Sequence, residues 1–177
     1  MILGDENSPI AVLGVGNVLL SDEGFGVRVV QHLMKWYDFE PSIRLIDGGT
    51  LGWDLLNFLQ GVEKLILVDA IDAKAVPGTF FVIKNEEVKK YFKRKVSGHE
   101  AGIQEVLAWF DLMGKPIKEV TVIGVQPQSL ETGLELTPLI KKFVPKAVDE
   151  ILKQLSQWGV KAIKRQKERD LGTWELI

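Results

Sequence analysis

The chain has 177 residues, 46% of them hydrophobic, which is enough apolar material for the core of one globular domain. Lys and Arg number 22 against 24 Asp and Glu, so the net charge of -2 does not favour nucleic acid or an anionic membrane surface as the main partner. The sequence has no cysteine, which excludes disulfides, thiolate nucleophiles and iron–sulfur ligation and fits a reducing, cytoplasmic location.

The N-terminal residues do not resemble a secretion signal, because Asp5 and Glu6 stand where such a signal carries basic residues. No apolar run approaches the roughly 18 residues that a membrane-spanning helix needs. We therefore expect a protein outside the membrane, and we expect it to act as a monomer.

The first half of the chain alternates strands and helices. Ile10–Val15 is a β-branched and aliphatic run, and Gly26–Tyr37 carries apolar residues at helical spacing, so the sequence predicts a strand followed by a helix. The same pattern recurs as a strand over Ile43–Ile46, a helix over Leu51–Leu59 and a strand over Lys64–Val68. This alternation predicts an α/β fold built on parallel strands.

The second half of the chain adds one strand that is expected to run antiparallel. Thr79–Ile83 follows Asp69 after only about nine residues, whereas a parallel crossover needs a dozen or more. The other predicted elements are a helix over Glu100–Met113, a buried strand over Val120–Val125, and a helix from Thr137 to about Gln157 that Pro145 kinks or interrupts.

Together these elements predict a single-domain, three-layer α/β fold with a twisted, mostly parallel mixed sheet of about five strands flanked by helices. The near-continuous apolar runs predict that the strands at Ile10–Val15, Lys64–Val68 and Val120–Val125 are interior, with both faces covered. The core is expected over about residues 10–157. Residues 161–177 are expected to form a variable, solvated tail or frayed helix, with a partner-docking arm as the alternative.

The glycine-rich segment at residues 14–26 does not fit a dinucleotide-binding fingerprint. Leu19 occupies the position of the required third glycine, and Asp22 and Glu23 stand where a pyrophosphate would meet free amide groups. The segment instead brings an acidic pair to the carboxyl edge of the first strand. The loop from Asn17 to Gly24 is expected to be mobile without a partner and to offer Leu19 and Leu20 for docking, unless both leucines are buried in the core.

Ligands of open α/β sheets bind at the carboxyl edge, where the strand order reverses. If the first three strands are ordered 2-1-3, Glu23 and Asp69 converge at this point and Asp47 lies one strand further out. Structural alternatives exist for the acidic residues: Asp22 as a helix N-cap, Asp47 in an Asx-turn, and Asp69 as a turn residue.

The two histidines differ in their surroundings. His32 lies inside the first predicted helix and is expected to be structural or surface-exposed. His99 stands where a loop enters a helix, again at a sheet edge. Glu23, Asp69 and His99 would form a set of one imidazole and two carboxylates that suits a borderline divalent metal ion.

Five segments of the sequence, in order, resemble the hydrogenase maturation endopeptidases, which remove the C-terminal extension from the large subunit of nickel–iron hydrogenases after nickel insertion. The matching segments are Gly14 to Val27, Asp47 to Gly52, Val68 to Ala70, Ser97 to His99 with Gly102, and Gly124 to Pro127 leading to Leu136 to Pro138. The resemblance spans about residues 10–157, and its first segment is the most specific.

The resemblance implies a twisted mixed sheet and a large-subunit precursor as partner. It also implies that Glu23, Asp69 and His99 bind metal and sense the nickel that the substrate carries, and other divalent ions are expected to fit the same site. We count Asp47 with these three as a candidate catalytic residue. Without thiolates such a site holds nickel weakly, as suits a protein that inspects a partner's metal.

Two chemical routes to cleavage remain open: a nickel-polarised carbonyl or metal-activated water, and a carboxylate acting as base on water. Two other functions compete with the endopeptidase. One is a non-catalytic metal-binding assembly factor, and the other is a metal-dependent phosphohydrolase, which the lack of a phosphate-cradling loop disfavours. A conventional zinc peptidase and a serine hydrolase are excluded, because neither a His-Glu-x-x-His motif nor a Gly-x-Ser-x-Gly elbow occurs.

Overall fold

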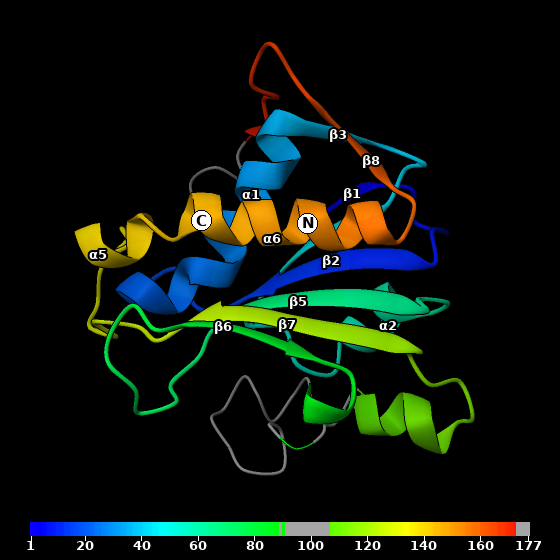
Figure 1. The fold of residues 1–177 in the computed structure, drawn as a ribbon, viewed down its shortest axis with the longest axis horizontal. Coiled ribbons are helices and arrows are strands. Elements are labelled where there is room, and N and C mark those ends of the chain that lie inside the picture. Colours follow the sequence, from blue (N-terminus) through cyan, green and yellow to red (C-terminus); the bar gives the residue numbers. More distant parts are fainter. Residues whose placement is uncertain (89, 91–106, 173–177) are drawn as a thin grey trace.

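Six strands form one sheet in the order β1–β4–β2–β5–β7–β6 (Figure 1). The computed structural model describes residues 1–88, 90 and 107–172. The strands are β1 (Ile2–Gly4), β2 (Ile10–Val15), β4 (Arg44–Gly49), β5 (Lys64–Ala70), β6 (Phe80–Lys84) and β7 (Glu119–Val125). The four central strands are mutually parallel, and the two edge strands β1 and β6 run antiparallel to their neighbours. The carboxyl ends of four strands therefore meet at one edge of the sheet.

Helices cover both faces of this sheet and give the fold three layers. Their bounds are η1 (Ser21–Gly24, a 3-10 helix), α1 (Phe25–Trp36), α2 (Leu55–Leu59), α5 (Pro138–Lys141) and α6 (Val144–Gln157), and residues 86–88 and 107–112 are also helical. α1 and α6 pack on one face, and α2 and the helix at residues 107–112 pack on the other.

Alternate residues of the central strands supply the two apolar layers. Val12 and Ile66 are buried against α1 and α6, whereas their neighbours Leu13 and Leu67 are buried on the α2 side. Successive side chains of a strand point to opposite faces, so a strand covered on both faces needs apolar residues throughout. All six residues of β2 are buried accordingly.

The central topology agrees with the sequence-based predictions. β2 lies between β4 and β5, which is the predicted 2-1-3 order, and β2, β5 and β7 are all interior strands. β6 is antiparallel to β7, as the short connection after Asp69 requires. The predicted C-terminal helix begins at the Thr137 N-cap and is interrupted, and Pro145 lies in the first turn of the second part, α6.

Three short strands were not predicted. β1 adds a sixth strand to the expected five, because only three residues pair with β4 and so short a run carries no periodic signal. β3 (Tyr37–Glu40) and β8 (Lys161–Lys164) form a separate two-stranded antiparallel sheet. The helix expected over Leu51–Leu59 is restricted to α2, and the first seven residues of the helix expected over Glu100–Met113 lie outside the described residues.

Residues 161–164 form the strand β8 rather than a frayed helix, and most of residues 161–172 are exposed, as expected of a solvated segment. β8 pairs with β3, and the backbone N–H groups of Arg165 and Arg169 donate to Trp36 O (2.8 Å) and Lys35 O (2.9 Å) at the end of α1. Asp38 accepts hydrogen bonds from both arginines. The charge run is therefore held against the domain by an acidic partner that lies more than a hundred residues earlier in the chain.

No helix in the described part of the chain is long and apolar enough to cross a membrane.

Candidate functional site

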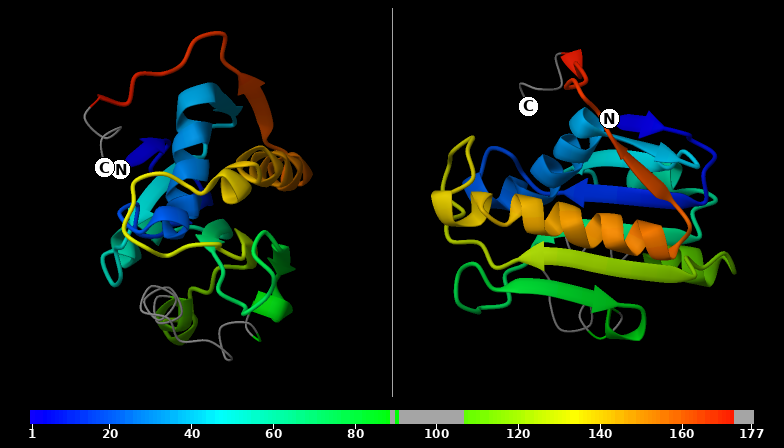
Figure 2. Two further views of the ribbon diagram at one scale, coloured as in Figure 1. Left: turned by 90° about the vertical axis from the view of Figure 1, so that its left-hand side faces the viewer. Right: turned by 45° about the horizontal axis from the view of Figure 1, so that its top comes forward.

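Four loops gather at the carboxyl edge of the sheet, which faces the viewer on the left of Figure 2. They follow β2, β4, β5 and β7 and comprise residues 16–24, 49–54, 71–79 and 126–137. Hydrogen bonds join them: Gly16 N donates to Gly49 O (2.9 Å), and Ser21 N donates to Gly133 O (2.8 Å). The predicted acidic residues lie in or beside three of these loops.

Two glycines let the start of α1 pack directly on the strands. A methyl group at Gly26 would lie 2.1 Å from the carbonyl oxygen of Val68 and 2.5 Å from that of Val15, and one at Gly14 would lie 2.3 Å from Gly26 O. These distances are shorter than any real van der Waals contact, so only glycine fits at either position. The glycines of this segment do not match a dinucleotide fingerprint. They instead allow the backbones of α1, β2 and β5 to pack closely together.

Glu23 is held beside β5 by this packing. It lies in η1, which contacts β5, and a methyl group at Gly16 would lie 1.8 Å from Glu23 O. Gly16 also has a φ of +131°, which side chains rarely adopt. Glu23 is half-buried, and its Oε2 atom is out of contact with solvent.

Asp22 is completely buried and does not act as the N-cap of α1, which is Gly24 and has no side-chain cap. Its carboxylate instead accepts hydrogen bonds from the loop after β7. The donors are Gln128 N (2.9 Å), Ser129 N (3.0 Å), Thr137 N (2.7 Å) and Thr137 Oγ1 (3.0 Å). Asp22 therefore fixes the position of the next residue, Glu23, relative to this loop.

Asp69 lies near the C-terminal end of β5 and is 5% exposed. Asp69 pairs with Gly124 of the neighbouring strand β7. It directly follows Val68, whose carbonyl oxygen lies against Gly26 of α1. The packing thus brings Glu23 and Asp69 to the same part of the edge, as the 2-1-3 order predicts.

Asp47 lies one strand further out, in β4, as predicted. Its Oδ1 accepts a hydrogen bond from Gly49 N (3.2 Å), which is the Asx-turn considered as its structural alternative. Its Oδ2 accepts from Gln31 Nε2 (3.0 Å). Both oxygens of Asp47 therefore make contacts that stabilise the turn after β4.

His99 and its motif lie outside the described residues. Within the described ranges, no group of three His, Cys, Asp or Glu side chains is placed to hold a metal ion, and the predicted set of Glu23, Asp69 and His99 stays a prediction. His32 is half-buried in α1 beside Tyr37, with ring centroids 6.4 Å apart. Burial, together with the nearby charges of Lys164 and Lys35, lowers the pKa of His32.

The loop after β2 exposes Leu19 (53%) and leaves Leu20 partly buried, so the two leucines are not both in the core. Gly133 N donates to Leu19 O (2.9 Å), and Leu20 forms a β-bridge with Gly133. Any motion of this loop without a partner must break these contacts.

Gln126 and Arg28 position the loops at this edge, and the sequence predicted no role for either residue. Gln126 is buried, and its Oε1 accepts hydrogen bonds from Ala73 N (2.8 Å) and Ala75 N (3.1 Å), which holds the loop after Asp69. Arg28 donates from Nη2 to Leu134 O (2.9 Å). Gln126 stands in a motif singled out above, but its partners are about fifty residues away in the sequence.

Acidic residues at the switch point of an open, twisted α/β sheet lie where proteins of this architecture bind their ligands. A family model described as hydrogenase maturation protease matches residues 27–154. The Escherichia coli hydrogenase 2 maturation protease is 40% identical over 162 residues, which cover 91% of this chain and 99% of the relative. The chain therefore belongs to the hydrogenase maturation protease family, and it is an endopeptidase.

Solved structures agree with this assignment. The hydrogenase maturating endopeptidase HybD from E. coli has a TM-score of 0.84 at 40% identity, covering 88% of this chain and 97% of that one. The [NiFe] hydrogenase maturation protease HybD from Thermococcus kodakarensis has a TM-score of 0.67 at 28% identity, covering 82% and 97%. Of the three functions considered from the sequence, membership of a protease family supports the endopeptidase and not the assembly factor or the phosphohydrolase.

Proposed function

We propose that this endopeptidase removes the C-terminal extension from the nickel-loaded large-subunit precursor of a nickel–iron hydrogenase. In this proposal Glu23, Asp69 and His99 recognise the nickel that the substrate carries. The names of the relatives support the substrate class, because one acts in the maturation of hydrogenase 2 and another in that of a [NiFe] hydrogenase. We also propose a cytoplasmic location, because a chain without cysteine depends on no disulfide.

The observation that carries the proposal is the contact between η1, which carries Glu23, and β5, which carries Asp69 near its C-terminal end, at the switch point. Both are held by backbone packing rather than by flexible loops, through Gly16 and Gly26 respectively. Carboxylate oxygens and an imidazole nitrogen are ligands that nickel and zinc accept, and thiolates, which would bind them more tightly, do not occur in this chain. Such a site suits transient recognition of a metal held by another protein.

Hydrolysis at this site requires that a water oxygen attack the scissile carbonyl carbon, and that a proton reach the leaving amine. A carboxylate of the pair accepts the proton from the attacking water and returns it to the amine nitrogen as the carbon–nitrogen bond breaks. Nickel bound to the substrate would polarise the carbonyl or lower the pKa of the water in the same arrangement.

The proposal is tested by incubating the protein with precursor in two forms, nickel-loaded and nickel-free, and weighing the products by mass spectrometry. We expect the nickel-loaded precursor to lose a single C-terminal peptide, with addition of one water across the cut bond. The nickel-free precursor is expected to keep its full mass. An unchanged mass of the loaded precursor would contradict the substrate assignment, and equal cleavage of both forms would contradict nickel recognition.

A further inference from the structure

Large apolar side chains are exposed on the four loops at the carboxyl edge. Six of the ten exposed large hydrophobic residues in the described part of the chain lie there, with exposed fractions from 38% to 77%. They are Leu19, Leu51, Trp53, Val76, Leu130 and Leu134, and we call them the apolar rim. An exposed apolar group of this kind, concentrated on one side of a molecule, marks a protein interaction surface.

The apolar rim rests on a backbone frame that is already ordered. Leu19 O accepts from Gly133 N (2.9 Å), which joins the loop of Leu19 to the loop of Leu130 and Leu134. Leu51 N donates to Gly48 O (2.9 Å) in the turn after β4. The loops of such a frame lose little backbone freedom when a partner binds, because their backbone is fixed beforehand.

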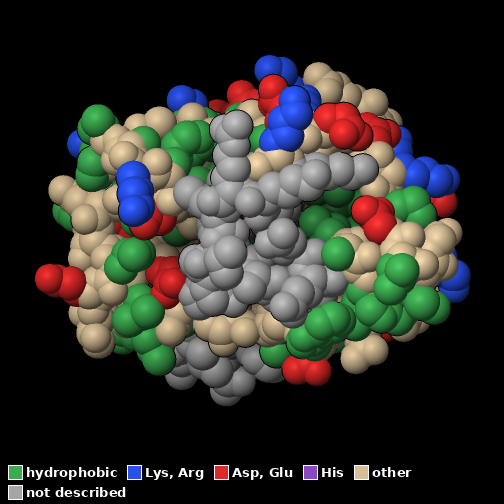
Figure 3. Space-filling view, turned by 90° about the horizontal axis from the view of Figure 1, so that it is seen from below, with side chains coloured by type: hydrophobic (Ala, Val, Ile, Leu, Met, Phe, Trp, Pro, Cys, Tyr) green, Lys and Arg blue, Asp and Glu red, His purple; other side chains and the backbone are tan. Residues whose placement is uncertain are grey.

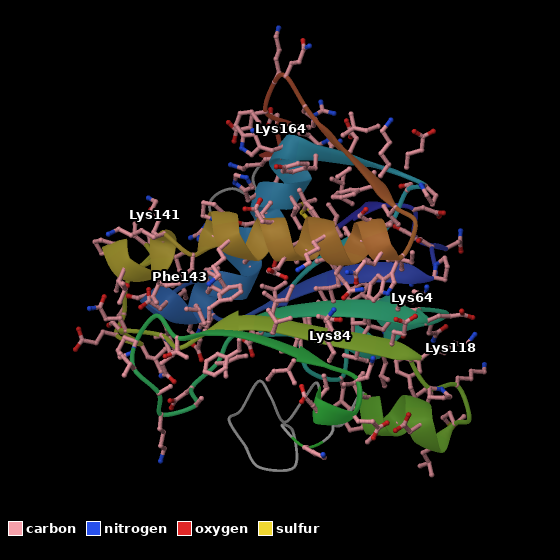
Figure 4. The ribbon with its side chains drawn as sticks, viewed as in Figure 1. Lys64, Lys84, Lys118, Lys141, Phe143 and Lys164 are labelled. Carbon is pink, nitrogen blue, oxygen red and sulfur yellow. The ribbon has the colours of Figure 1, made fainter. Side chains whose placement is uncertain are left out.

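The four loops carry an excess of negative charge. Their exposed charged residues are Asp54, Asp72, Glu131 and Glu135 against Lys74, and Lys141, just beyond the last loop, pairs with Glu135 (3.6 Å), so four negative charges against two positive leave a net -2. Of the lysines labelled in Figure 4, Lys64 and Lys118 lie at the opposite end of the sheet, where β5 and β7 begin, whereas Lys141 lies on the side of the carboxyl edge. In Figure 3, hydrophobic and acidic side chains occur on the left side, toward the carboxyl edge, together with basic side chains.

We propose that the apolar rim is the docking surface for the folded body of the substrate protein, beyond the peptide that is cut. The partner surface it fits is apolar at its centre and basic around it, which complements the exposed acidic residues. The inference rests on the proposed function. The loops that bear the rim adjoin Glu23, Asp47 and Asp69, so a protein that presents a peptide bond to these carboxylates must cover the rim.

The test measures binding separately from cleavage. Trp53→Ser and Leu130→Ser, made singly, are compared with the matched control Ile163→Ser, which alters an exposed apolar residue (43%) of β8 outside the four loops. Binding to nickel-loaded precursor is measured by surface plasmon resonance, and cleavage by mass spectrometry. We expect each rim variant to weaken binding roughly tenfold, while the control binds as the unaltered protein does. At saturating precursor the rim variants are expected to keep their kcat and to show a raised KM.

Two results would overturn the inference. The first is that the rim variants bind the precursor as tightly as the control variant does, whether or not they cleave it. The other is sedimentation of the unaltered protein as a dimer that Leu130→Ser dissociates, because the rim would then bind a second copy. Tight, rim-dependent binding without any cleavage by the unaltered protein would support docking and contradict the proposed function, so the two claims fail separately.

Discussion

The carboxylate of Asp22 accepts hydrogen bonds from both the backbone N–H (2.7 Å) and the hydroxyl (3.0 Å) of Thr137, a residue 115 positions further along the chain. Thr137 is also the N-cap of α5, because its Oγ1 accepts from Ile140 N (3.4 Å). One buried carboxylate thus connects η1, which carries Glu23, to the loop and helix on the other side of the edge. Asp22 thus positions the frame that carries Glu23, and the role of Glu23 in the site stays a prediction.

Asp22→Asn is expected to destabilise the protein by about 2–4 kcal/mol, because an amide cannot accept from all four donors and leaves buried N–H groups unpaired. Urea denaturation measures this directly. Asp54→Asn is the control, because Asp54 is exposed and makes no side-chain cap to α2, and it should change stability by less than about 0.5 kcal/mol. Equal stability of the two variants would contradict the role assigned to Asp22.

Gly26→Ala should destabilise the fold by at least about 2 kcal/mol, because the added methyl group would lie 2.1 Å from Val68 O and must force α1 away from the strands. Gly52→Ala is the matched control, since no atom lies within 4 Å of a methyl group there. Thermal unfolding of both variants gives the comparison. A Gly26→Ala protein as stable as Gly52→Ala would refute the packing argument.

His32 should make stability depend on pH just below neutrality. Its pKa is lowered in the folded protein, chiefly by burial, so the unfolded chain binds the proton more readily. The free energy of unfolding should therefore fall as the pH drops below about 6.5, the ordinary value for histidine, and level off below the folded pKa. His32→Gln should flatten this part of the profile in denaturation experiments at pH 5 to 8. An unchanged profile would show that His32 titrates normally.

Asp38 should make the stability depend on pH in a second, more acidic pH range than His32 does. Burial alone would raise its pKa, but hydrogen bonds from Arg165 and Arg169 outweigh this and lower it. The contribution is therefore present above the ordinary carboxyl pKa and is lost as the pH falls through the lowered value. Asp38→Asn should also speed hydrogen exchange in β8 at neutral pH, relative to α6. Unchanged exchange in β8 would contradict the anchoring of residues 161–172.

The centre of the fold was predictable because its strands are uniformly apolar. β2, β5 and β7 are buried on both faces, and the short link between β5 and β6 allows only an antiparallel strand. β1, β3 and β8 were missed because each has only three or four residues. β8 also lies in a charged run, and only its partner Asp38 explains why that run packs against the domain.

The site was predictable as far as topology determines it. If the first three strands are ordered 2-1-3, Glu23, Asp69 and Asp47 lie at one edge, and the sheet has this order. The role of Asp22 did not follow, because its hydrogen-bond donors lie 106 to 115 residues away and no local pattern links them to it. The place of His99 in the site stays a prediction from the sequence.

Processing of nickel-loaded precursor by three single variants, Glu23→Gln, Asp69→Asn and His99→Ala, tests the central claim most directly. Each substitution removes a charge or ligand while leaving the packing glycines in place, and His32→Gln serves as a control outside the site. We predict that the precursor keeps its full mass with each of the three variants and is cut normally by the control, with all four proteins folded by circular dichroism. Complete processing by both Glu23→Gln and His99→Ala would contradict the proposed site.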